Sequence, residues 1–475
     1  MRLGFQGLRS GRVGLLIVAL VFVECLRQSL FVALGPASVV LDAAEYWRSG
    51  AAVARGDWLQ LTINTPYRTP FYAYWLAVPQ RWCGDWALLT VVLAQHLIVL
   101  ATTLFTCLWA VKATGRTAFG ILAYVLFWPL MTRFWYANAI LTETLFAFPF
   151  TIGVGLLLLY DQRPRWILAL WAGLFLGIAT LVRPVPQLLI PALAILWIGM
   201  GWTRWSGWSS GRTARHAALF VGVFGVVLLP CLARNQWLYG QLFLTRLPAV
   251  NRWAVAFRDG SGGDLPWPDS PAARRMETIL QTGPGVLQDR HGSLVQRDLI
   301  TAGLAADESE ALMAQVSMDA IYQEPANFLW KAFKRIVNFW RCSSNSPPYG
   351  GSEPPDFQQQ AVWQLPRLAV VGRFFSEHQV TGFLWWNQLF SLATLAAAVR
   401  LCWVPHERWK GVVLLATMGY FCTLTGLVEI ENYRYRMVLE PLMVWSCVLA
   451  IATLFPKRAE PAGSADRPLA GGTTN

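Results

Sequence analysis

Charged side chains are scarce in this chain of 475 residues, because Asp, Glu, Lys and Arg make up only 14% of it, against about 25% in ordinary soluble domains. Apolar residues make up 55%. This balance excludes a secreted or cytosolic globular enzyme and a disordered chain. The eight cysteines form no CxxC pair and no Cys/His cluster with metal-ligand spacing. A disulfide-rich mini-protein and a zinc site held by thiolates are therefore excluded as well.

Other patterns are also missing. No Gly-rich phosphate loop follows a strand pattern, and no repeat of fixed period recurs along the chain. The first apolar run carries Glu24 and Arg27 and lacks a clear small-residue cleavage site, so we expect it to stay as a span and not to be a cleaved signal peptide. A helical membrane protein with many spans remains.

Apolar runs of about 20 residues, the length that crosses a bilayer, recur about ten times. The expected spans are 13–33, 87–111, 118–136, 138–160, 166–182, 185–200, 216–233, 380–401, 411–428 and 437–455. The 25 tryptophans cluster near the ends of these runs, as in interfacial aromatic belts. The predicted fold class is an all-α polytopic membrane protein with about ten transmembrane helices, interfacial helices in the first outer loop and a mostly helical extracytoplasmic domain.

Basic residues predict the sidedness of the chain. Placing the amino terminus inside makes 1–12, 112–117, 161–165, 201–215, 400–410 and 456–475 the inside segments. These hold 16 basic and four acidic residues, a net charge of +12, while the rest of the chain holds 23 of each sign. The positive charge thus follows the positive-inside rule. Because it is spread over short loops and not gathered into one patch, we expect no nucleic-acid partner.

The predicted organisation has four parts. Residues 1–233 form an N-terminal transmembrane bundle with a catalytic first outer loop at 34–86. Residues 234–379 form an extracytoplasmic domain, 380–456 the C-terminal transmembrane helices, and 457–475 a disordered cytoplasmic tail. Within 326–341 apolar residues recur at helical spacing opposite Lys331, Lys334 and Arg335. This amphipathic pattern fits a helix lying at the membrane surface, and equally a helix packed on the domain's own core with a solvated charged face.

Ionisable side chains collect at the predicted outer ends of the spans, where they can meet in one outer-leaflet site. They are Asp42, Glu45, Arg68, Arg133, Glu143, Arg183, Arg234, Glu429, Glu431, Arg434 and Arg436. The segment that starts at Asp42 is predicted to be helical, which puts Asp42, Glu45 and Tyr46 on one face. Such a carboxylate pair can supply a general base or hold a divalent cation such as Mg or Mn. It also fits an ordinary solvated helix face.

Arg183 stands at a membrane boundary in a Val-Arg-Pro sequence, where a guanidinium needs an anion or a route to water. A lipid phosphate is the obvious anion, and Arg234 and Arg434 can bind one in the same way. Each is also readable as an interfacial anchor.

Groups deeper in the spans have two interpretations as well. His96, Glu24 and Arg27 fit a proton or ion path, or simple pairing with neighbouring helices. Cys83 and Cys342 both fall on the predicted outer side, so the predicted topology allows a disulfide between them.

Short motifs in a fixed order carry a family resemblance: Asp42, Tyr46 and Gly56-Asp57-Trp58; Tyr67-Arg68-Thr69-Pro70-Phe71-Tyr72; Leu141-Thr142-Glu143-Thr144-Leu145-Phe146; Gly173-Leu174-Phe175-Leu176-Gly177-Ile178-Ala179 with Leu181-Val182-Arg183-Pro184; Pro230, Arg234-Asn235 and Gly240; and Tyr433-Arg434-Tyr435 with Glu440-Pro441. In this order the chain resembles the dolichyl-phosphate-mannose-protein mannosyltransferase-like glycosyltransferases of the GT-C class, which include aminoarabinose lipid A transferase-like enzymes. The resemblance covers about residues 35 to 441. The family's first loop often has adjacent acids where this chain has Asp42-Ala43-Ala44-Glu45, which leaves metal dependence open.

The resemblance implies a membrane enzyme that moves a sugar from a polyprenyl-phosphate donor to a lipid, glycan or protein acceptor outside the cytoplasm, usually with inversion. It implies a bacterial inner or cell membrane location with the site on the extracytoplasmic side. Asp42 matches the family's catalytic carboxylate, assisted by Glu45. We expect the donor phosphate at Arg68, Arg183, Arg234 and Arg434, and substrate contacts from Tyr46, Tyr67, Glu143, Tyr433 and Arg436.

Other functions remain open at this point. A lipid-linked glycan ligase or polymerase uses a diphosphate carrier and would depend more on His291 and His378. A transporter or flippase would be expected to show inverted repeats and broken helices around midplane charges. A purely structural scaffold would need no carboxylates and guanidinium groups gathered at one rim.

Overall fold

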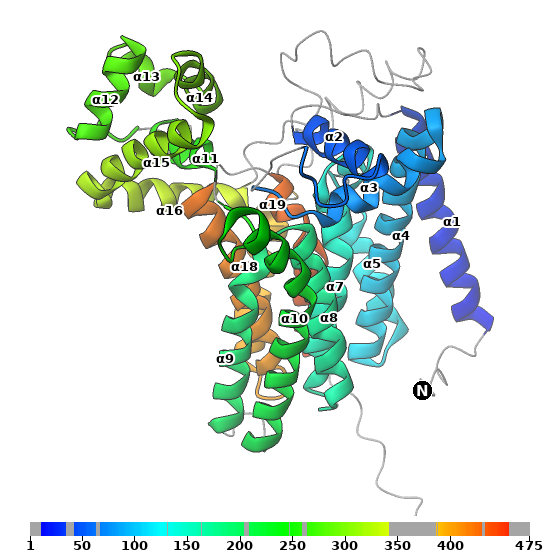
Figure 1. The fold of residues 1–475 in the computed structure, drawn as a ribbon. Helices are drawn as coiled ribbons and strands as arrows, with labels where there is room; N and C mark the ends of the chain where they lie inside the picture. Colours follow the sequence, from blue (N-terminus) through cyan, green and yellow to red (C-terminus); the bar gives the residue numbers. More distant parts are fainter. Residues whose placement is uncertain are drawn as a thin grey trace, which may run out of the picture.

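The computed structural model describes residues 11–34, 42–62, 67–130, 132–162, 164–203, 209–246, 248–258, 264–341, 386, 388–429 and 433–455. Within these ranges the regular structure is helical and no β-strand forms. Long helices run side by side as a bundle, and a group of shorter helices projects from one end of it (Figure 1). We call that end the projecting end, and the helices α11 to α15 the projecting domain.

Five helices of the described chain are long and apolar enough to cross a membrane: Gly84–Thr114, Thr142–Tyr160, Val185–Trp202, Ser210–Tyr239 and Arg408–Val428. They contain α4 (Ala87–Thr114), α7 (Thr142–Tyr160), α9 (Leu189–Trp202), α10 (Ser210–Tyr239) and α18 (Arg408–Val428). Shorter apolar helices run beside them: α5 (Thr117–Phe127), α8 (Trp166–Val182), Gln388–Trp403 and α20 (Glu440–Ala452). The bundle is completed by α1 (Gly11–Leu34), a 24-residue helix at its edge (Figure 1).

Helices overlap the predicted spans, although part of 380–401 lies outside the described residues, and the count of ten spans stays a prediction. At one place the structure differs. The single helix expected over 118–136 is wrong, because the chain forms α5, breaks, and restarts as α6 (Thr132–Asn138). Pro129 lies in the break, where its missing N–H and its ring disfavour a continuing helix. Arg133 donates to the carbonyl oxygens of Phe127 and Leu130, both at 2.8 Å, and so satisfies backbone groups that the break exposes.

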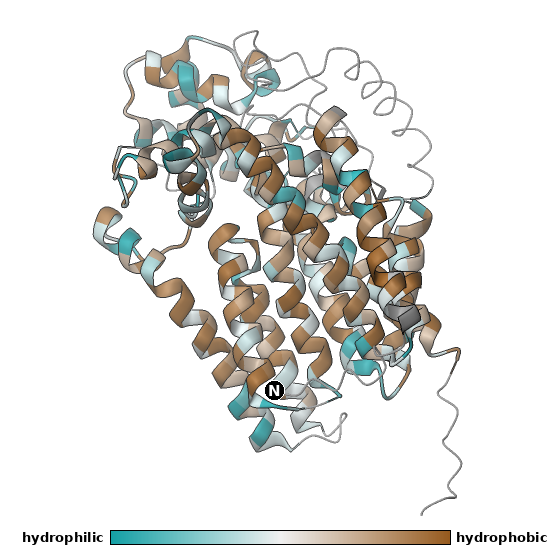
Figure 2. Ribbon diagram, turned by 90° about the vertical axis from the view of Figure 1, so that its right-hand side faces the viewer, coloured by the Kyte–Doolittle hydropathy of each residue, from teal (hydrophilic) through white to brown (hydrophobic). Residues whose placement is uncertain are grey.

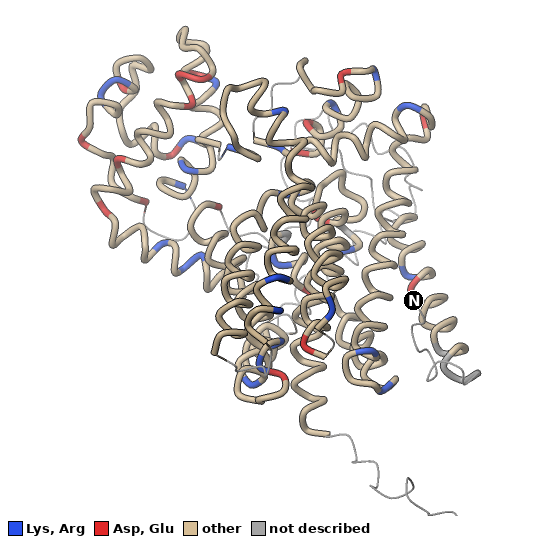
Figure 3. Tube along the Cα trace, turned by 60° about the horizontal axis from the view of Figure 1, so that its bottom comes forward, with Lys and Arg blue, Asp and Glu red and all other residues tan. Residues whose placement is uncertain are grey.

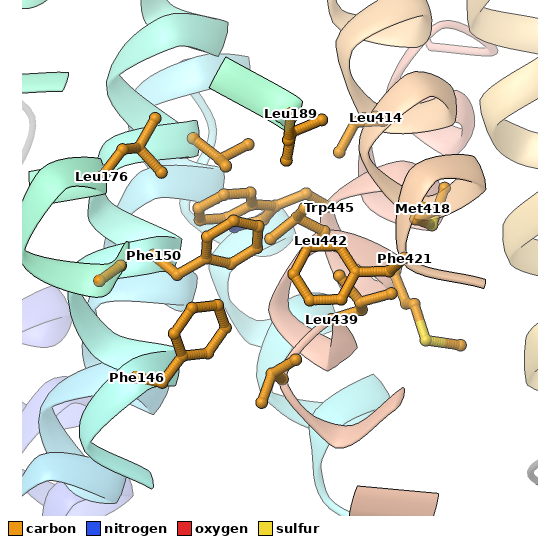
Figure 4. Close-up of a cluster of buried hydrophobic side chains, with 14 of the residues drawn as sticks. Phe146, Phe150, Leu176, Leu189, Leu414, Met418, Phe421, Leu439, Leu442 and Trp445 are labelled. Carbon is orange, nitrogen blue, oxygen red and sulfur yellow. The ribbon is translucent and has the colours of Figure 1, made fainter. Parts of the chain in front are cut away.

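The bundle is held by a core of buried apolar side chains. Figure 4 shows its centre, where Phe146 and Phe150 of α7 face Phe421 of α18 and Trp445 of α20. The Phe150 and Phe421 ring centroids are 5.2 Å apart, within the range of favourable aromatic pairs. This contact joins helices that are far apart in the sequence.

Glycines let helices of the bundle approach closely. At Gly173 of α8, an added Cβ would stand 2.4 Å from the carbonyl oxygen of Phe220 in α10. A Cβ at Gly153 would stand 2.5 Å from the Leu176 side chain, and one at Gly177 would stand 2.8 Å from the Val227 side chain. Such small residues allow tight packing between membrane helices.

Two short helices of the first outer loop, α2 (Asp42–Ala54) and α3 (Phe71–Trp82), pack on each other across the projecting end (Figure 1). The projecting domain consists of α11 (Ala249–Phe257), α12 (Pro271–Leu280), α13 (Pro284–Asp289), α14 (Gly292–Thr301) and α15 (Ala306–Gln323). Trp253, Phe257 and Met313 are buried in its own apolar core. Hydropathy separates the two bodies: apolar residues dominate the bundle, and hydrophilic ones are frequent in the projecting domain (Figure 2).

Two further helices pack on the spanning helix α18. α16 (Pro325–Arg341) follows α15 directly and packs on α18. The short helix α19 (Tyr433–Met437) precedes α20 and packs against α16 and α18.

The opposite end of the bundle carries the loops predicted to be inside. There the Gln162 side chain donates to the Ala113 carbonyl at 2.8 Å, and Tyr160 pairs with His216 at 2.7 Å. These contacts hold the ends of α4, α7 and α10 together. Lys and Arg residues lie among the helix ends of this region, as Figure 3 shows. The sidedness itself stays a prediction. α10 extends to Tyr239, past the predicted boundary at residue 233.

Candidate functional site

The guanidinium of Arg68 bonds to three polar side chains on one face of α2. Arg68 donates to Glu45 at 2.7 and 2.9 Å, to Asp42 at 3.0 Å and to the Tyr46 hydroxyl at 2.8 Å. The guanidinium carbon also lies 4.3 Å from the centre of the Tyr46 ring, in cation–π geometry. The three side chains therefore share one helix face, as predicted, and the basic residue that meets them comes from the loop before α3.

The side chains of this cluster differ in their exposure to solvent, and their charges affect the pKa of Arg68. Burial alone lowers the pKa of Arg68, but Tyr46, Asp42 and Glu45 outweigh it and raise this pKa above its ordinary value. Arg68 thus stays charged. Asp42 is the more exposed of the two acids, with 40% of its side chain accessible against 31% for Glu45.

These contacts do not favour a metal site at Asp42 and Glu45. The carboxylates that could have held a divalent cation both accept from Arg68. Within the described ranges no group of three His, Cys, Asp or Glu side chains could hold a metal ion. The pair is therefore built as a carboxylate–guanidinium cluster.

A second ion pair lies next to this cluster. Arg183, which ends α8, donates to Glu143 in the first turn of α7 at 2.7 Å. Its guanidinium carbon is 5.1 Å from the centre of the Tyr435 ring. Thr69 donates to the carbonyl oxygen of Val182 at 3.1 Å. Because Thr69 follows Arg68 and Val182 precedes Arg183, this bond brings the two segments that carry these arginines into contact.

Two buried polar side chains, Tyr72 and Gln95, lie next to the Arg68 cluster and link it to the segment before α7. Tyr72 of α3 is fully buried, its ring meets that of Tyr46 edge-on at 5.0 Å, and its hydroxyl donates to Gln95 of α4 at 3.0 Å. The Gln95 amide donates to the carbonyl oxygens of Ala137 and Ala139, both at 2.8 Å. Ala137 lies in the last turn of α6 and Ala139 in the break before α7, so Gln95 holds the segment that leads into the helix of Glu143.

Tyr67 connects the cluster with the projecting domain. Its hydroxyl donates to Glu310 of α15 at 2.5 Å. Burial, and then the Glu310 carboxylate, raises the pKa of Tyr67 well above its ordinary value, so the phenol keeps its proton at physiological pH. The bond spans 243 positions of sequence and places α15 against the loop that carries Arg68.

The remaining predicted site residues have other surroundings. Arg234 donates to the Leu59 carbonyl at 2.9 Å and to Asn235 at 2.8 Å, so it holds the first outer loop from below. Arg436 is fully buried and donates to Ser391 at 2.6 Å. The side chains of Tyr433 and Arg434 lie outside the part of the chain that the structure describes, as do Glu431, His378 and Cys342 with its possible partnership to Cys83.

The charged groups within the spans form a compact cluster at the edge of the bundle. Glu24 accepts from Arg27 at 3.0 Å, from Arg133 at 3.3 Å and from Tyr124 at 3.2 Å. Arg27 also donates to the Trp128 carbonyl at 2.8 Å. These contacts tie α1 to α5 and α6, as expected of pairing between neighbouring helices. His96 likewise pairs with Asn138 at 2.9 Å.

The sequence pattern did not single out Thr69, Gln95 or Glu310 as site residues. Thr69 lies inside the Tyr67–Tyr72 motif, so its position next to Arg68 was a signal. Gln95 gave a weaker one, as a polar residue in an apolar run beside His96. Glu310 is one of several acids in an exposed helix, and nothing in its spacing sets it apart.

No protein-family model and no curated protein matches the chain. Among solved structures it is similar to ArnT from Cupriavidus metallidurans, whose crystal structure is bound to undecaprenyl phosphate. The two chains are 12% identical with a TM-score of 0.37, and the match covers 92% of this chain and 77% of that chain. A likeness this distant does not assign the chain to a family.

Proposed function

We propose that this protein is a membrane glycosyltransferase that moves a sugar from a polyprenyl-phosphate donor to an acceptor on the extracytoplasmic side. The observation that carries the proposal is the meeting of the Asp42–Glu45–Arg68 cluster with the Glu143–Arg183 pair through the Thr69–Val182 bond. The residues that we propose as general base and as phosphate-binding guanidinium are thereby carried on contacting segments at one end of the bundle. A soluble sugar nucleotide would not need such a position, whereas a lipid-borne sugar would.

In this reaction Asp42 takes the proton of the acceptor hydroxyl as its oxygen attacks the anomeric carbon of the sugar. The bond from that carbon to the phosphate oxygen breaks, and its electron pair leaves with the lipid phosphate. Attack from the face opposite the phosphate inverts the anomeric centre. Asp42 suits this role because it is the more exposed acid, while Arg68, which also bonds to Glu45, holds it in place.

Arg183 neutralises the charge that builds on the departing phosphate. A guanidinium has five N–H donors in a rigid fork, so it can bind phosphate oxygens while Glu143 holds it from the other side. Such positioned charges lower the barrier most where water is excluded, and only 14% of the Arg183 side chain is accessible. Arg434 would add to the same phosphate site, whereas Arg234 supports the loop below it.

The direct test is sugar transfer by the purified protein from labelled polyprenyl-phosphate sugars. We expect Asp42→Asn to lower turnover by about 10² to 10⁴, the usual contribution of a general base, with donor binding retained. Arg183→Ala should weaken binding of the polyprenyl phosphate itself. Asp85→Asn is the matched control, because Asp85 is an exposed acid in the same outer loop. Full turnover by Asp42→Asn would refute the assignment of the base.

A further inference from the structure

The charged and apolar faces of α16 are turned the opposite way from those of a helix on a soluble domain. Lys331 is 2% exposed and Arg335 is fully buried. Leu329, Trp330 and Phe333 are instead 61%, 59% and 52% exposed. The spacing of these apolar residues, with Val337 one turn further on, puts them on one face of the helix.

The buried cations of α16 bond to carbonyl oxygens at the ends of two other helices. Lys331 donates to the Ala256 carbonyl at 2.7 Å, and Arg335 donates to the carbonyls of Val255 at 3.3 Å and Gly426 at 2.7 Å. These oxygens belong to the last turns of α11 and α18. Carbonyls of a last helical turn lack partners within the helix and favour a cation. The charged face of α16 therefore fastens the projecting domain to a spanning helix.

The same contacts set the depth of α16 along the bundle. Gly426 lies where α18, one of the apolar spanning helices, ends at the projecting end. A Cβ at Gly426 would stand 2.6 Å from Ile336 and 3.0 Å from the Ala332 carbonyl, so the two helices touch directly. In Figure 1, α16 runs crosswise to the bundle at this level. α16 therefore lies at the level where the apolar spanning helix α18 ends.

We propose that this outward face, formed by Leu329, Trp330, Phe333 and Val337, inserts into the lipid of the adjoining membrane leaflet. The position of α16 at the end of a helix long and apolar enough to cross a membrane points to lipid as the occupant. Trp330 and Phe333 stack at 5.4 Å and form a flat apolar surface of the kind found at the boundary between headgroups and acyl chains. The projecting domain is then held at a fixed height, with its cations capping helices and its apolar face in the membrane. This inference requires membrane embedding but not the proposed reaction.

Photo-crosslinking of the full-length protein in phosphatidylethanolamine–phosphatidylglycerol nanodiscs tests the insertion. The variant Phe333→p-benzoylphenylalanine keeps an aromatic ring at an exposed position, and Trp330→p-benzoylphenylalanine is a second probe of the same face. We expect ultraviolet light to attach a lipid to both variants, as seen by mass spectrometry of the intact protein. The lipid yield should approach that of Leu229→p-benzoylphenylalanine on α10, a spanning helix, where the side chain is 56% exposed.

The matched control is Val286→p-benzoylphenylalanine on α13. Val286 is 58% exposed and lies in the part of the projecting domain far from the bundle (Figure 1). A lipid yield at residues 330 and 333 several times that at 286 would support the proposal. Equal yields at all three positions would overturn it. Attachment to a second copy of the chain, or to another protein, in place of lipid would overturn it too.

Discussion

The guanidinium of Arg68 bonds to Asp42, Glu45 and Tyr46 at once, so the geometry of this cluster depends on the shape of one side chain. Lysine has the same charge but no planar fork, and it cannot keep all of these contacts. A hydrogen bond to a charged group contributes about 1.5 to 3 kcal/mol. We therefore predict that Arg68→Lys lowers sugar transfer by roughly 10- to 100-fold, since about 1.4 kcal/mol corresponds to a factor of ten.

Turnover of the purified variant measures this effect. Arg81→Lys on α3 is the control, because Arg81 is exposed and makes only a long bond of 3.4 Å to the Ala54 carbonyl. If Arg68→Lys kept the activity of Arg81→Lys, the cluster would not depend on the fork.

Asp161, just after α7 at the opposite end of the bundle, makes stability depend on pH. Burial raises the pKa of Asp161 to about 6, although Lys410 nearby lowers it. The folded protein therefore holds a proton that the unfolded chain, with an ordinary pKa of about 4, gives up more readily. Stability is highest below that ordinary pKa and falls as pH rises through about 6.

We predict that Asp161→Asn raises the melting temperature at pH 7.5 and leaves it nearly unchanged at pH 4. The gain in free energy of unfolding at the higher pH should be about 1 to 3 kcal/mol, since one pKa unit corresponds to about 1.36 kcal/mol. Thermal unfolding in detergent at both pH values measures it. Asp85→Asn, at an exposed position, should change neither value. A gain for Asp161→Asn that is the same at both pH values would contradict the prediction.

At the scale of helices, Gln95 joins three elements beneath the candidate site. Leucine at this position would leave Tyr72 and the carbonyls of Ala137 and Ala139 without their buried bonds to Gln95. Each such loss costs about 1 to 3 kcal/mol. Since these bonds fix the start of α7, we predict that Gln95→Leu moves Glu143 and lowers turnover more than it weakens donor binding.

The kcat and KM of sugar transfer separate those two effects. Gln162→Leu is the matched control, because Gln162 makes one exposed bond, to Ala113, at the opposite end of the bundle. A general loss of stability would not distinguish kcat from KM. If both variants transferred sugar at the same rate, Gln95 would have no positioning role.

The contact between α8 and α10 depends on Gly173. A methyl group there would meet the Phe220 carbonyl of the partner helix at 2.4 Å, and backbone cannot rotate aside as a side chain can. We predict that Gly173→Ala lowers the free energy of unfolding by about 1 to 3 kcal/mol, the usual cost of overpacking. Gly222→Ala on α10, where a Cβ would meet nothing within 4 Å, should be neutral or slightly stabilising. Equal melting temperatures for the two variants would contradict this explanation of the helix contact.

Spans could be predicted from sequence because hydrophobicity acts locally, residue by residue. The break at Pro129 had a local signal as well, but the apolar run around it concealed the signal. The direction in which each helix face turns could not be predicted in this way. The sequence shows that α16 is amphipathic, yet Lys331 and Arg335 turn inward because the ends of α11 and α18 meet there. In the same way Arg68 was expected to bind phosphate, whereas its contacts here are to the acids of α2. Such pairings are set by tertiary packing.

At the scale of the whole molecule, the contacts that hold the projecting domain to the bundle include the bond from Asn251 of α11 to Glu429 at 2.6 Å. Two other connections involve α16 and the loop of Arg68. α16 bonds to α18 on one side, and Tyr67 bonds to Glu310 of α15 on the other. The second connection passes directly into the loop of Arg68. The projecting domain is therefore linked to the candidate site through this hydrogen bond.

We predict that Tyr67→Phe and Glu310→Gln lower the free energy of unfolding and the rate of sugar transfer through the same bond. Burial and Glu310 keep the pKa of Tyr67 high, so the phenol donates throughout the pH range of an assay. The double variant should then be no worse than the more affected single variant, with a coupling energy of about 0.5 to 3 kcal/mol. Tyr322→Phe, at a 74% exposed position on the same helix as Glu310, should change neither quantity. Strictly additive effects of the two single variants would mean that the projecting domain and the site act independently.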